Sequence, residues 1–554
     1  MQPPAELIIS GRIATLRGAA GFGWVEALAI HHGCVVATGS LDDLETLAGS
    51  ITKRWQLGRH LLVTPSITDA HLHLIDAALA AGQLDLSSLD VAGVAGAIAG
   101  RHRQRLAAGD ARGWLLGHGW SLADLGGRPG RELLDEAAPG RPVALWSHDH
   151  HARWLSSEAL RVAAIIGRDD PPAGRLERDT GGQPTGILYE QAAGLVDAAI
   201  PEATASQVES AVSAYARVLA GLGVASVHDP GGVAPDPLLH GGPTRYRAMA
   251  SAGGLPLRVT ASVREEQLEL AIEMGFRSGR PEGERPSGRY RDGWLKAFSD
   301  GALGSRTAAL LAPYESDDPA GPPPGGALGM RLRTPERLAE LARRAAQAGI
   351  ASQIHAIGDA AVRATLDVLE TVPPVPGAMH RIEHAQLVHP ADLPRFAGAG
   401  IAASVQPCHL LSDAEAARAA WGARSATAFP LGDLDRQGTL LPFGTDAPVE
   451  PPDPWPGIAA AVTRRGAGWP AHAAFGPRQA VSLARALRGA CLDGPRSARA
   501  ADEGHLDVGA RADLLILPAE PFDGPASAEQ LASVRPLATM LDGSVVFESP
   551  DFDP

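Results

Sequence analysis

The sequence predicts an α/β protein built on a (β/α)8 barrel, with a small β domain formed by both termini and an inserted subdomain after the first barrel strand. Two observations lead to this fold class. From about Leu61 to Leu441, short apolar strands alternate with Ala-rich amphipathic stretches, which is typical of a parallel sheet. Both ends of the chain instead carry β-rich runs broken by Gly. We expect these two ends to meet in one small sheet or sandwich.

The predicted domain boundaries follow from these changes in sequence pattern. The runs "ELIISGRIATL" and "EALAIHHGCVVATGS" near the start are similar to "GHLDVGARADLLILPAE" and "RPLATMLDGSVVFES" near the end. We assign residues 1–60 and 501–554 to the small β domain and residues 61–500 to the barrel. Roughly 150 residues separate His73 from the next strand candidate, "VASVHDP", which is far more than one crossover helix needs. An inserted subdomain is therefore expected at about residues 77–213.

Composition excludes several classes of protein. Hydrophobic residues make up 45% and charged residues 20% of the 554 residues, as in soluble globular proteins. The net charge of -14 disfavours nucleic acid as a partner, because binding to phosphates depends on Lys and Arg. We find neither a signal peptide nor an apolar run long enough to span a bilayer. The three distant cysteines fit a reducing compartment. We expect a cytoplasmic protein without a membrane partner.

Several predicted strands end in residues that can bind a cation. His71 and His73 lie two apart in "TPSITDAHLHL", a spacing that puts both imidazoles on the same face of a strand. Later strands end in "GWLKAFSDG", "ASQIHAIGD", "HRIEHAQ" and "LPFGTDAPV". A (β/α)8 barrel opens all its strand C-termini onto one face, whereas a doubly wound sheet would bring them together less completely. The predicted metal ligands are His71, His73, Lys296, His355, His384 and Asp446.

Nitrogen and carboxylate ligands of this kind suit zinc, although manganese, iron, cobalt or nickel could occupy the same set. Lys296 requires an explanation, because a cation repels an ammonium group. We expect Lys296 either to lose its charge or to react with CO2, and the resulting carbamate would bridge two ions. The alternative is an ordinary strand lysine paired with Asp300. The alternative for His71 and His73 is a pair of hydrogen-bonded histidines near a strand end.

Five motifs, in this order, resemble those of the amidohydrolase superfamily, specifically its family 3 branch of YtcJ-like metal-dependent hydrolases: "TPSITDAHLHL", "GWLKAFSDGALGSRTAAL", "SQIHAIGDAA", "HRIEHAQL" and "FGTDAPVEPPDP". The resemblance covers almost the whole chain, including "GQPTGILYE" in the inserted region. It implies a (β/α)8 barrel with a side β-sandwich built from both termini, and a cation site at the barrel mouth.

The resemblance also implies a role for each ligand. The more buried ion would be bound by His71, His73 and Asp446. Lys296 in carbamate form would bridge, and a second ion would be held by His355 and His384. Some relatives work with one ion, so the ion count stays open. The chain departs from the family pattern at Ser66 and His150, where Gly is frequent, and at Ser156, where Asn is frequent. These departures weaken the transfer of any substrate by analogy.

The predicted function is hydrolysis of a non-peptide C–N bond of amide, N-formyl or carbamate type in a small molecule by metal-activated water. Asp446 and Lys296 are the predicted catalytic residues. Asp446 would accept a proton from the water and pass it to the leaving nitrogen, the alternative being a turn-capping aspartate. Arg306 would clamp a substrate oxygen, and His151 would line the pocket or polarise a carbonyl. The alternatives are a surface salt bridge for Arg306 and a structural role for His151.

Two further residues are weaker candidates. Asp69, two residues before His71, could orient a metal ligand without binding the ion itself, and His228 could touch the substrate. Two other functions stay open: the same site could deaminate a substrate or hydrolyse an ester or lactone, and a barrel without catalysis could serve as a binding or scaffold protein. A homodimer is also possible from the sequence.

Overall fold

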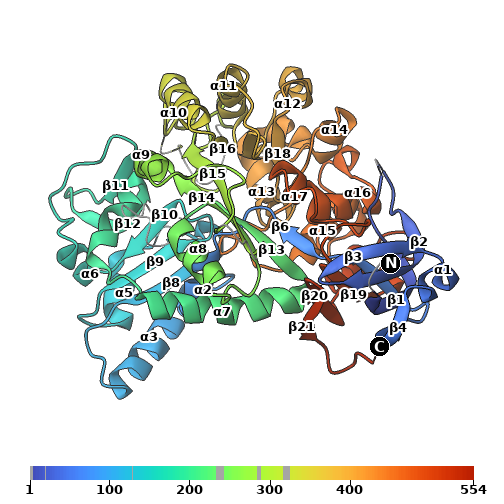
Figure 1. Cartoon of the computed structure of the whole chain (residues 1–554). Coiled ribbons are helices and arrows are strands. Elements are labelled where there is room, and N and C mark those ends of the chain that lie inside the picture. Colours follow the sequence, from blue (N-terminus) through green and yellow to red (C-terminus); the bar gives the residue numbers. More distant parts are fainter. Residues whose placement is uncertain are drawn as a thin grey trace.

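The computed structural model describes residues 4–18, 20–127, 129–232, 242–283, 288–315, 323 and 325–553. Within this part of the chain the strands form three sheets. Figure 1 shows a parallel sheet in the middle of the molecule, a sheet built from both termini on one side, and the sheet of the inserted region on the other. Within the described residues, no helix has both the length and the apolar character needed to cross a bilayer.

The central sheet has seven strands, and every neighbouring pair is parallel. In spatial order they are β18 (Ala402–Ser404), β17 (Arg381–His384), β16 (Ala351–Ala356), β15 (Tyr290–Phe298), β14 (Arg258–Arg264), β13 (Val224–Asp229) and β6 (Ile67–Asp69). The strands are almost completely buried, as expected for a parallel sheet that is covered on both faces.

The two edges of this sheet are joined by residues 440–446. The backbone N–H of Val405, after β18, donates to the carbonyl of Pro442 (2.9 Å). The N–H of Ala70, after β6, donates to the carbonyl of Phe443 (2.9 Å). The sheet therefore curls, and its first and last strands lie near each other through this segment. The α/β class with a curled parallel sheet is confirmed; the count of eight barrel strands stays a prediction.

Helices cover the outside of the curled sheet (Figure 1). They are α2 (Leu74–Ala80), α7 (Ala205–Leu222), α8 (Pro243–Ser251), α9 (Leu268–Glu273), α10 (Pro335–Gln347), α11 (Asp359–Leu369), α12 (Leu393–Gly398), α13 (His409–Trp421), α14 (Leu431–Arg436), α15 (Pro454–Thr463), α16 (Leu483–Arg488) and α17 (Gly494–Ser497).

Helix α10 shows why these stretches are helical. The Thr334 side chain caps its N-terminus, and Pro335 occupies the first turn, where its missing N–H costs nothing. The buried residues recur with helical spacing and form one apolar stripe against the sheet: Leu338, Leu341, Ala342 and Ala345.

The terminal sheet contains strands from both ends of the chain. Its order is β21 (Ser544–Glu548), β20 (Ala538–Leu541), β19 (Leu514–Pro518), β5 (Leu61–Pro65), β1 (Ala5–Ala14), β2 (Trp24–His31) and β3 (Cys34–Gly39), with β4 (Ala48–Gln56) paired to β1. The N- and C-terminal parts meet where β5 pairs antiparallel with β19.

Strand β5 lies beyond the predicted boundary at residue 60. The sandwich arrangement and the domain boundaries remain predictions from the sequence. Two short helices, α1 (Leu41–Glu45) and α18 (Ala528–Ala532), flank these strands in the chain.

A buried ion-pair cluster connects the terminal sheet to the parallel sheet. Arg258, at the start of β14, is 3% exposed, and its guanidinium donates to both carboxylate oxygens of Asp513 at 2.6 and 2.9 Å. The same group also contacts Asp542. The charge of Arg258 is therefore compensated by residues from the other sheet.

The inserted region forms the third sheet, with the order β11 (Gly174–Arg178), β12 (Pro184–Glu190), β10 (Ala152–Leu155), β9 (Val143–Ser147), β8 (Leu115–Trp120) and β7 (Leu84–Asp85). Its helices are α3 (Val91–Ala107), α4 (Leu122–Leu125), α5 (Arg131–Ala137) and α6 (Ser157–Val162), followed by the 3-10 segment Gln191–Ala199. Strands β9 and β10 are antiparallel, so residues 148–151 form the turn between them.

Candidate metal centre

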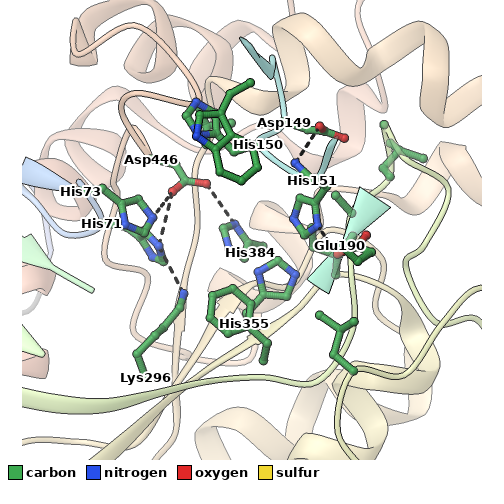
Figure 2. A pocket seen from close by; sticks show the side chains of 18 of the residues that line it. His71, His73, Asp149, His150, His151, Glu190, Lys296, His355, His384 and Asp446 are labelled. Atoms are coloured by element: carbon green, nitrogen blue, oxygen red, sulfur yellow. Dashed lines mark hydrogen bonds and ion pairs between the residues drawn. The ribbon is translucent and has the colours of Figure 1, made fainter. Parts of the chain in front are cut away.

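The six predicted ligands all line one pocket (Figure 2). They follow or end strands of the parallel sheet, or belong to the segment that joins its edges, and each is at most 6% exposed: His71, His73, Lys296, His355, His384 and Asp446. Parallel strands have their carboxyl ends at the same edge, which is why residues from distant parts of the chain meet here. The structure therefore brings together all six residues that the sequence predicts.

The tightest group consists of His71, His73 and Asp446. Nε2 of His71 lies 3.4 Å and Nε2 of His73 lies 3.3 Å from Oδ1 of Asp446. Nδ1 of His73 is 2.5 Å from the carbonyl oxygen of Gly231, so Nδ1 carries the proton and Nε2 is left with its lone pair. The ligand atoms of the three residues all lie within 4.8 Å of one another. This arrangement suits a shared cation.

Glu383 is a buried partner that the sequence reasoning missed. It contacts Nδ1 of His71, which leaves Nε2 of His71 facing Asp446. Nε of Arg381 donates to Oε1 of Glu383 at 2.9 Å. Burial would raise the pKa of Glu383, but the charge of Arg381 and the contact with His71 hold it well below its ordinary value. A glutamate directly before His384 in a strand was the signal available in the sequence.

Asp446 is ionised in this environment. Burial would raise its pKa, but the imidazoles around it together hold the pKa well below the ordinary value of an aspartate: His71, His409, His73 and His384. Its backbone has a positive φ of 65°, a conformation that places it in a sharp turn after the segment that joins the sheet edges. The carboxylate can therefore bind a cation or accept a proton.

Lys296 is 1% exposed, and its Nζ lies 3.4 Å from Nε2 of His71 and 4.8 Å from the centre of the Phe298 ring. Burial lowers the pKa of Lys296 to about 8. Asp300, the partner in the alternative interpretation, instead accepts hydrogen bonds from the backbone N–H groups of Ala309, Ile357 and Gly358.

A second group of potential ligands consists of His384, His409 and Asp446. Nδ1 of His384 is buried without a hydrogen-bond partner among the described residues and lies 3.9 Å from Oδ2 of Asp446. Nε2 of His409 lies 3.3 Å from the same oxygen, and its Nδ1 lies 3.4 Å from Oε1 of Glu450. His355 packs on His384 with ring centres 4.5 Å apart, but its Nε2 faces the carbonyl of Gly301 at 3.1 Å.

His409 was missed because it does not end a strand. It begins α13, five residues after β18, within "VQPCHLLSD". The position after the carboxyl end of a further parallel strand was a signal that could have found it. The donor atoms of both groups are imidazole nitrogens and carboxylate oxygens, which fit a divalent cation such as zinc. The unpartnered nitrogen of His384 is consistent with that interpretation.

The other predicted residues divide between the pocket and its surroundings. His151 lines the pocket, and its Nδ1 lies 2.9 Å from Oε2 of Glu190. Burial would lower its pKa, but Glu190 raises it to about 9. Arg306 is not among the described residues that line the pocket: its guanidinium lies 5.3 Å from the centre of the Tyr314 ring and donates to the carbonyl of Glu315 at 3.4 Å. Its substrate role stays a prediction.

The two weaker candidates lie behind the pocket wall. Asp69 accepts hydrogen bonds from the backbone N–H of His71 (3.1 Å) and from the N–H and hydroxyl of Thr445 (3.0 and 2.6 Å). It thus ties together the two backbone segments that carry His71 and Asp446. His228 does not line the pocket within the described residues, and its Nδ1 accepts from Arg381 at 2.9 Å.

A family model described as "Amidohydrolase family" matches residues 59–547. The chain belongs to the amidohydrolase family. It is 30% identical over 534 residues to the putative amidohydrolase YtcJ of Bacillus subtilis (strain 168), covering 94% of this chain and 96% of that protein. It is 28% identical over 503 residues to the N-substituted formamide deformylase of Arthrobacter pascens, covering 88% of each. The predicted membership is thus confirmed.

The fold also matches a solved structure. The crystal structure of an uncharacterized metal-dependent hydrolase from Pyrococcus horikoshii OT3 superimposes with a TM-score of 0.73 at 26% identity, covering 94% of this chain and 98% of that one. Together with the buried His/Asp groups, the family and this structure support a metal-dependent hydrolase.

Proposed function

We propose that the protein hydrolyses a non-peptide C–N bond of amide, N-formyl or carbamate type in a small molecule. The observation that carries the proposal is the meeting of His71, His73 and Asp446 in one buried pocket at the carboxyl ends of parallel strands. The similarity to a formamide deformylase supports the C–N class. We also propose that residues 440–446 complete an eight-stranded barrel.

The proposed cofactor is one or two zinc ions. The first would be held by His71, His73 and Asp446. The second would be held by His384 with either His355, as the sequence predicts, or His409, whose Nε2 lies closer to Asp446. When bound, the cation supplies a water of lowered pKa and polarises the scissile carbonyl.

Lys296 is proposed to carry a carbamate. The Nζ atom would attack CO2 and release one proton, and the new carboxylate would replace a cationic ligand by an anionic one. The proposal is supported by the position of Nζ beside His71, because an ammonium group there would repel a cation. An intact-mass measurement under native conditions would detect the mass of one added CO2, which should be lost in Lys296→Ala.

The chain's own groups then handle the substrate and the proton. The Asp446 carboxylate accepts a proton from the attacking water and delivers it to the leaving nitrogen. His151 is on the other side of the pocket from His73 (Figure 2), and its Nδ1 is occupied by Glu190. Its Nε2 is therefore the atom available to a substrate carbonyl.

The test is metal analysis followed by a substrate panel. Purified protein is expected to contain zinc and to release formate or an amine from N-formyl amines, simple amides or carbamates. Ammonia from amino-heterocycles would show deamination instead, and hydrolysis of lactones alone would show an esterase or lactonase. A folded protein that retains no metal and hydrolyses nothing would favour the binding or scaffold role. The cytoplasmic location and the homodimer remain proposals from the sequence.

A further inference from the structure

The turn between β9 and β10 supplies four consecutive residues, 148–151, to the pocket. Three of them have polar partners in the protein: Glu450 for His148 (3.2 Å), Ser147 for Asp149 (2.6 Å) and Glu190 for His151 (2.9 Å). The contact between His148 and Glu450 connects the inserted region to the segment that follows Asp446. The inserted region therefore forms one wall of the site, and three of its four turn residues are held in place by the protein itself.

His150 is the exception. Both of its ring nitrogens are buried, and neither has a hydrogen-bond partner among the described residues. Its backbone adopts a φ of 56°, in the left-handed region that histidine rarely occupies. A buried polar group without a partner and a strained backbone both destabilise the folded protein. A residue that lines the pocket and destabilises the fold in these two ways indicates a hydrogen-bond partner that is not part of the protein.

The ring of His150 is held in a fixed orientation. It stacks on the indole of Trp146 with ring centres 5.5 Å apart and an angle of 15° between the planes. The Arg153 guanidinium lies 4.4 Å from the centre of the same indole, which is thus held in turn. Figure 2 shows His150 in the same part of the pocket as Asp446. A ligand would therefore meet imidazole nitrogens that are already oriented.

We propose that His150 is a substrate-binding residue that uses a ring nitrogen to hydrogen-bond a neutral polar substituent, such as a carboxamide, ureido or hydroxyl group, on the part of the substrate outside the scissile bond. The inference rests on the proposed function for the identity of that bond. A neutral imidazole offers one N–H donor and one acceptor that point away from each other, so a single ring nitrogen can pair with the carbonyl oxygen or the NH2 of a carboxamide. Burial, together with His118 and His73, lowers the pKa of His150 well below its ordinary value, in keeping with a neutral ring.

The experiment uses two N-formyl amines of similar shape, one with a carboxamide and one with an isopropyl group in its place: N-formylglycinamide and N-formylisobutylamine. The zinc-loaded wild type is expected to show a kcat/KM about two- to tenfold higher for the carboxamide, the effect of a hydrogen bond between neutral groups. His150→Phe keeps a ring that can stack on Trp146 but removes both nitrogens, so this preference should disappear. His150→Asn should restore part of it. His118→Phe changes a neighbouring histidine that does not line the pocket in the described structure, and should keep the preference.

Equilibrium binding of the same two compounds to the metal-free protein separates this inference from the proposed function. Calorimetry should show tighter binding of the carboxamide to the wild type and equal binding of both compounds to His150→Phe. If binding depends on His150 but no compound is hydrolysed, the inference stands and the proposed N-formyl chemistry fails. Equal binding of both compounds to the wild type overturns the inference. So does a preference that persists in His150→Phe or in His150→Gly, with melting temperatures showing that the variants are folded.

Discussion

Glu383 contacts Nδ1 of His71 inside the pocket wall, although the two residues are 312 positions apart in the chain. The contact determines which imidazole nitrogen faces the pocket. With Nδ1 occupied, Nε2 presents its lone pair toward Asp446, 3.4 Å away. The carboxylate is itself held by Arg381. A proposed metal ligand, His71, is thus oriented by a carboxylate and a guanidinium that contribute no ligand atom to either proposed ion.

Glu383→Gln should weaken metal binding about 10- to 100-fold, because the amide no longer fixes the His71 tautomer as a carboxylate does. Competition with a chelator of known affinity measures the effect. Glu340→Gln is the matched control, since Glu340 forms an exposed pair with Arg337 on α10. An unchanged metal affinity in Glu383→Gln would show that the contact has no role in orienting the ligand.

Asp446→Asn should lower kcat by about 100- to 10,000-fold, the range of a lost general acid–base group, while retaining most of the metal. The amide keeps the shape and one ligand oxygen but cannot accept the proton. Steady-state kinetics and metal analysis on the same preparation separate the two effects. Full activity in this variant would refute the assignment of Asp446 as the base.

His409→Ala should reduce the amount of bound metal more than His355→Ala does. Nε2 of His409 lies 3.3 Å from Asp446, whereas Nε2 of His355 faces a backbone carbonyl. Elemental analysis after removal of excess zinc gives the number of metal ions bound per chain in each variant. The reverse order of loss would favour the ligand set that the sequence predicts. Equal metal content in both variants and the wild type would exclude both histidines as ligands.

Arg258→Ala should destabilise the folded protein by about 3–5 kcal/mol, since it leaves the buried carboxylate of Asp513 without its partner. Urea unfolding gives the change in the free energy of unfolding, provided that the transition is cooperative. Arg12→Ala is the control: Arg12 and Asp523 form a partly exposed pair, with an expected effect of about 1 kcal/mol or less. A similar small effect for both variants would mean that the connection between the two sheets does not depend on Arg258.

The sequence alone determined the α/β class, the family and the six residues that meet in the pocket. This was possible because strand ends can be identified from local apolar runs, and parallel strands place their carboxyl ends at one edge. His71, Lys296 and Asp446 could thus be assigned to one site although they lie far apart in the chain.

Only the tertiary structure decided which groups surround those six. The contact of Glu383 with His71, the approach of His409 to Asp446 and the unpartnered nitrogens of His150 depend on side-chain directions and on packing between distant segments. The position of the Arg306 guanidinium, 5.3 Å from the centre of the Tyr314 ring, likewise could not be read from the sequence. Local sequence specifies where a strand ends; the packing of the whole chain specifies what each side chain there meets.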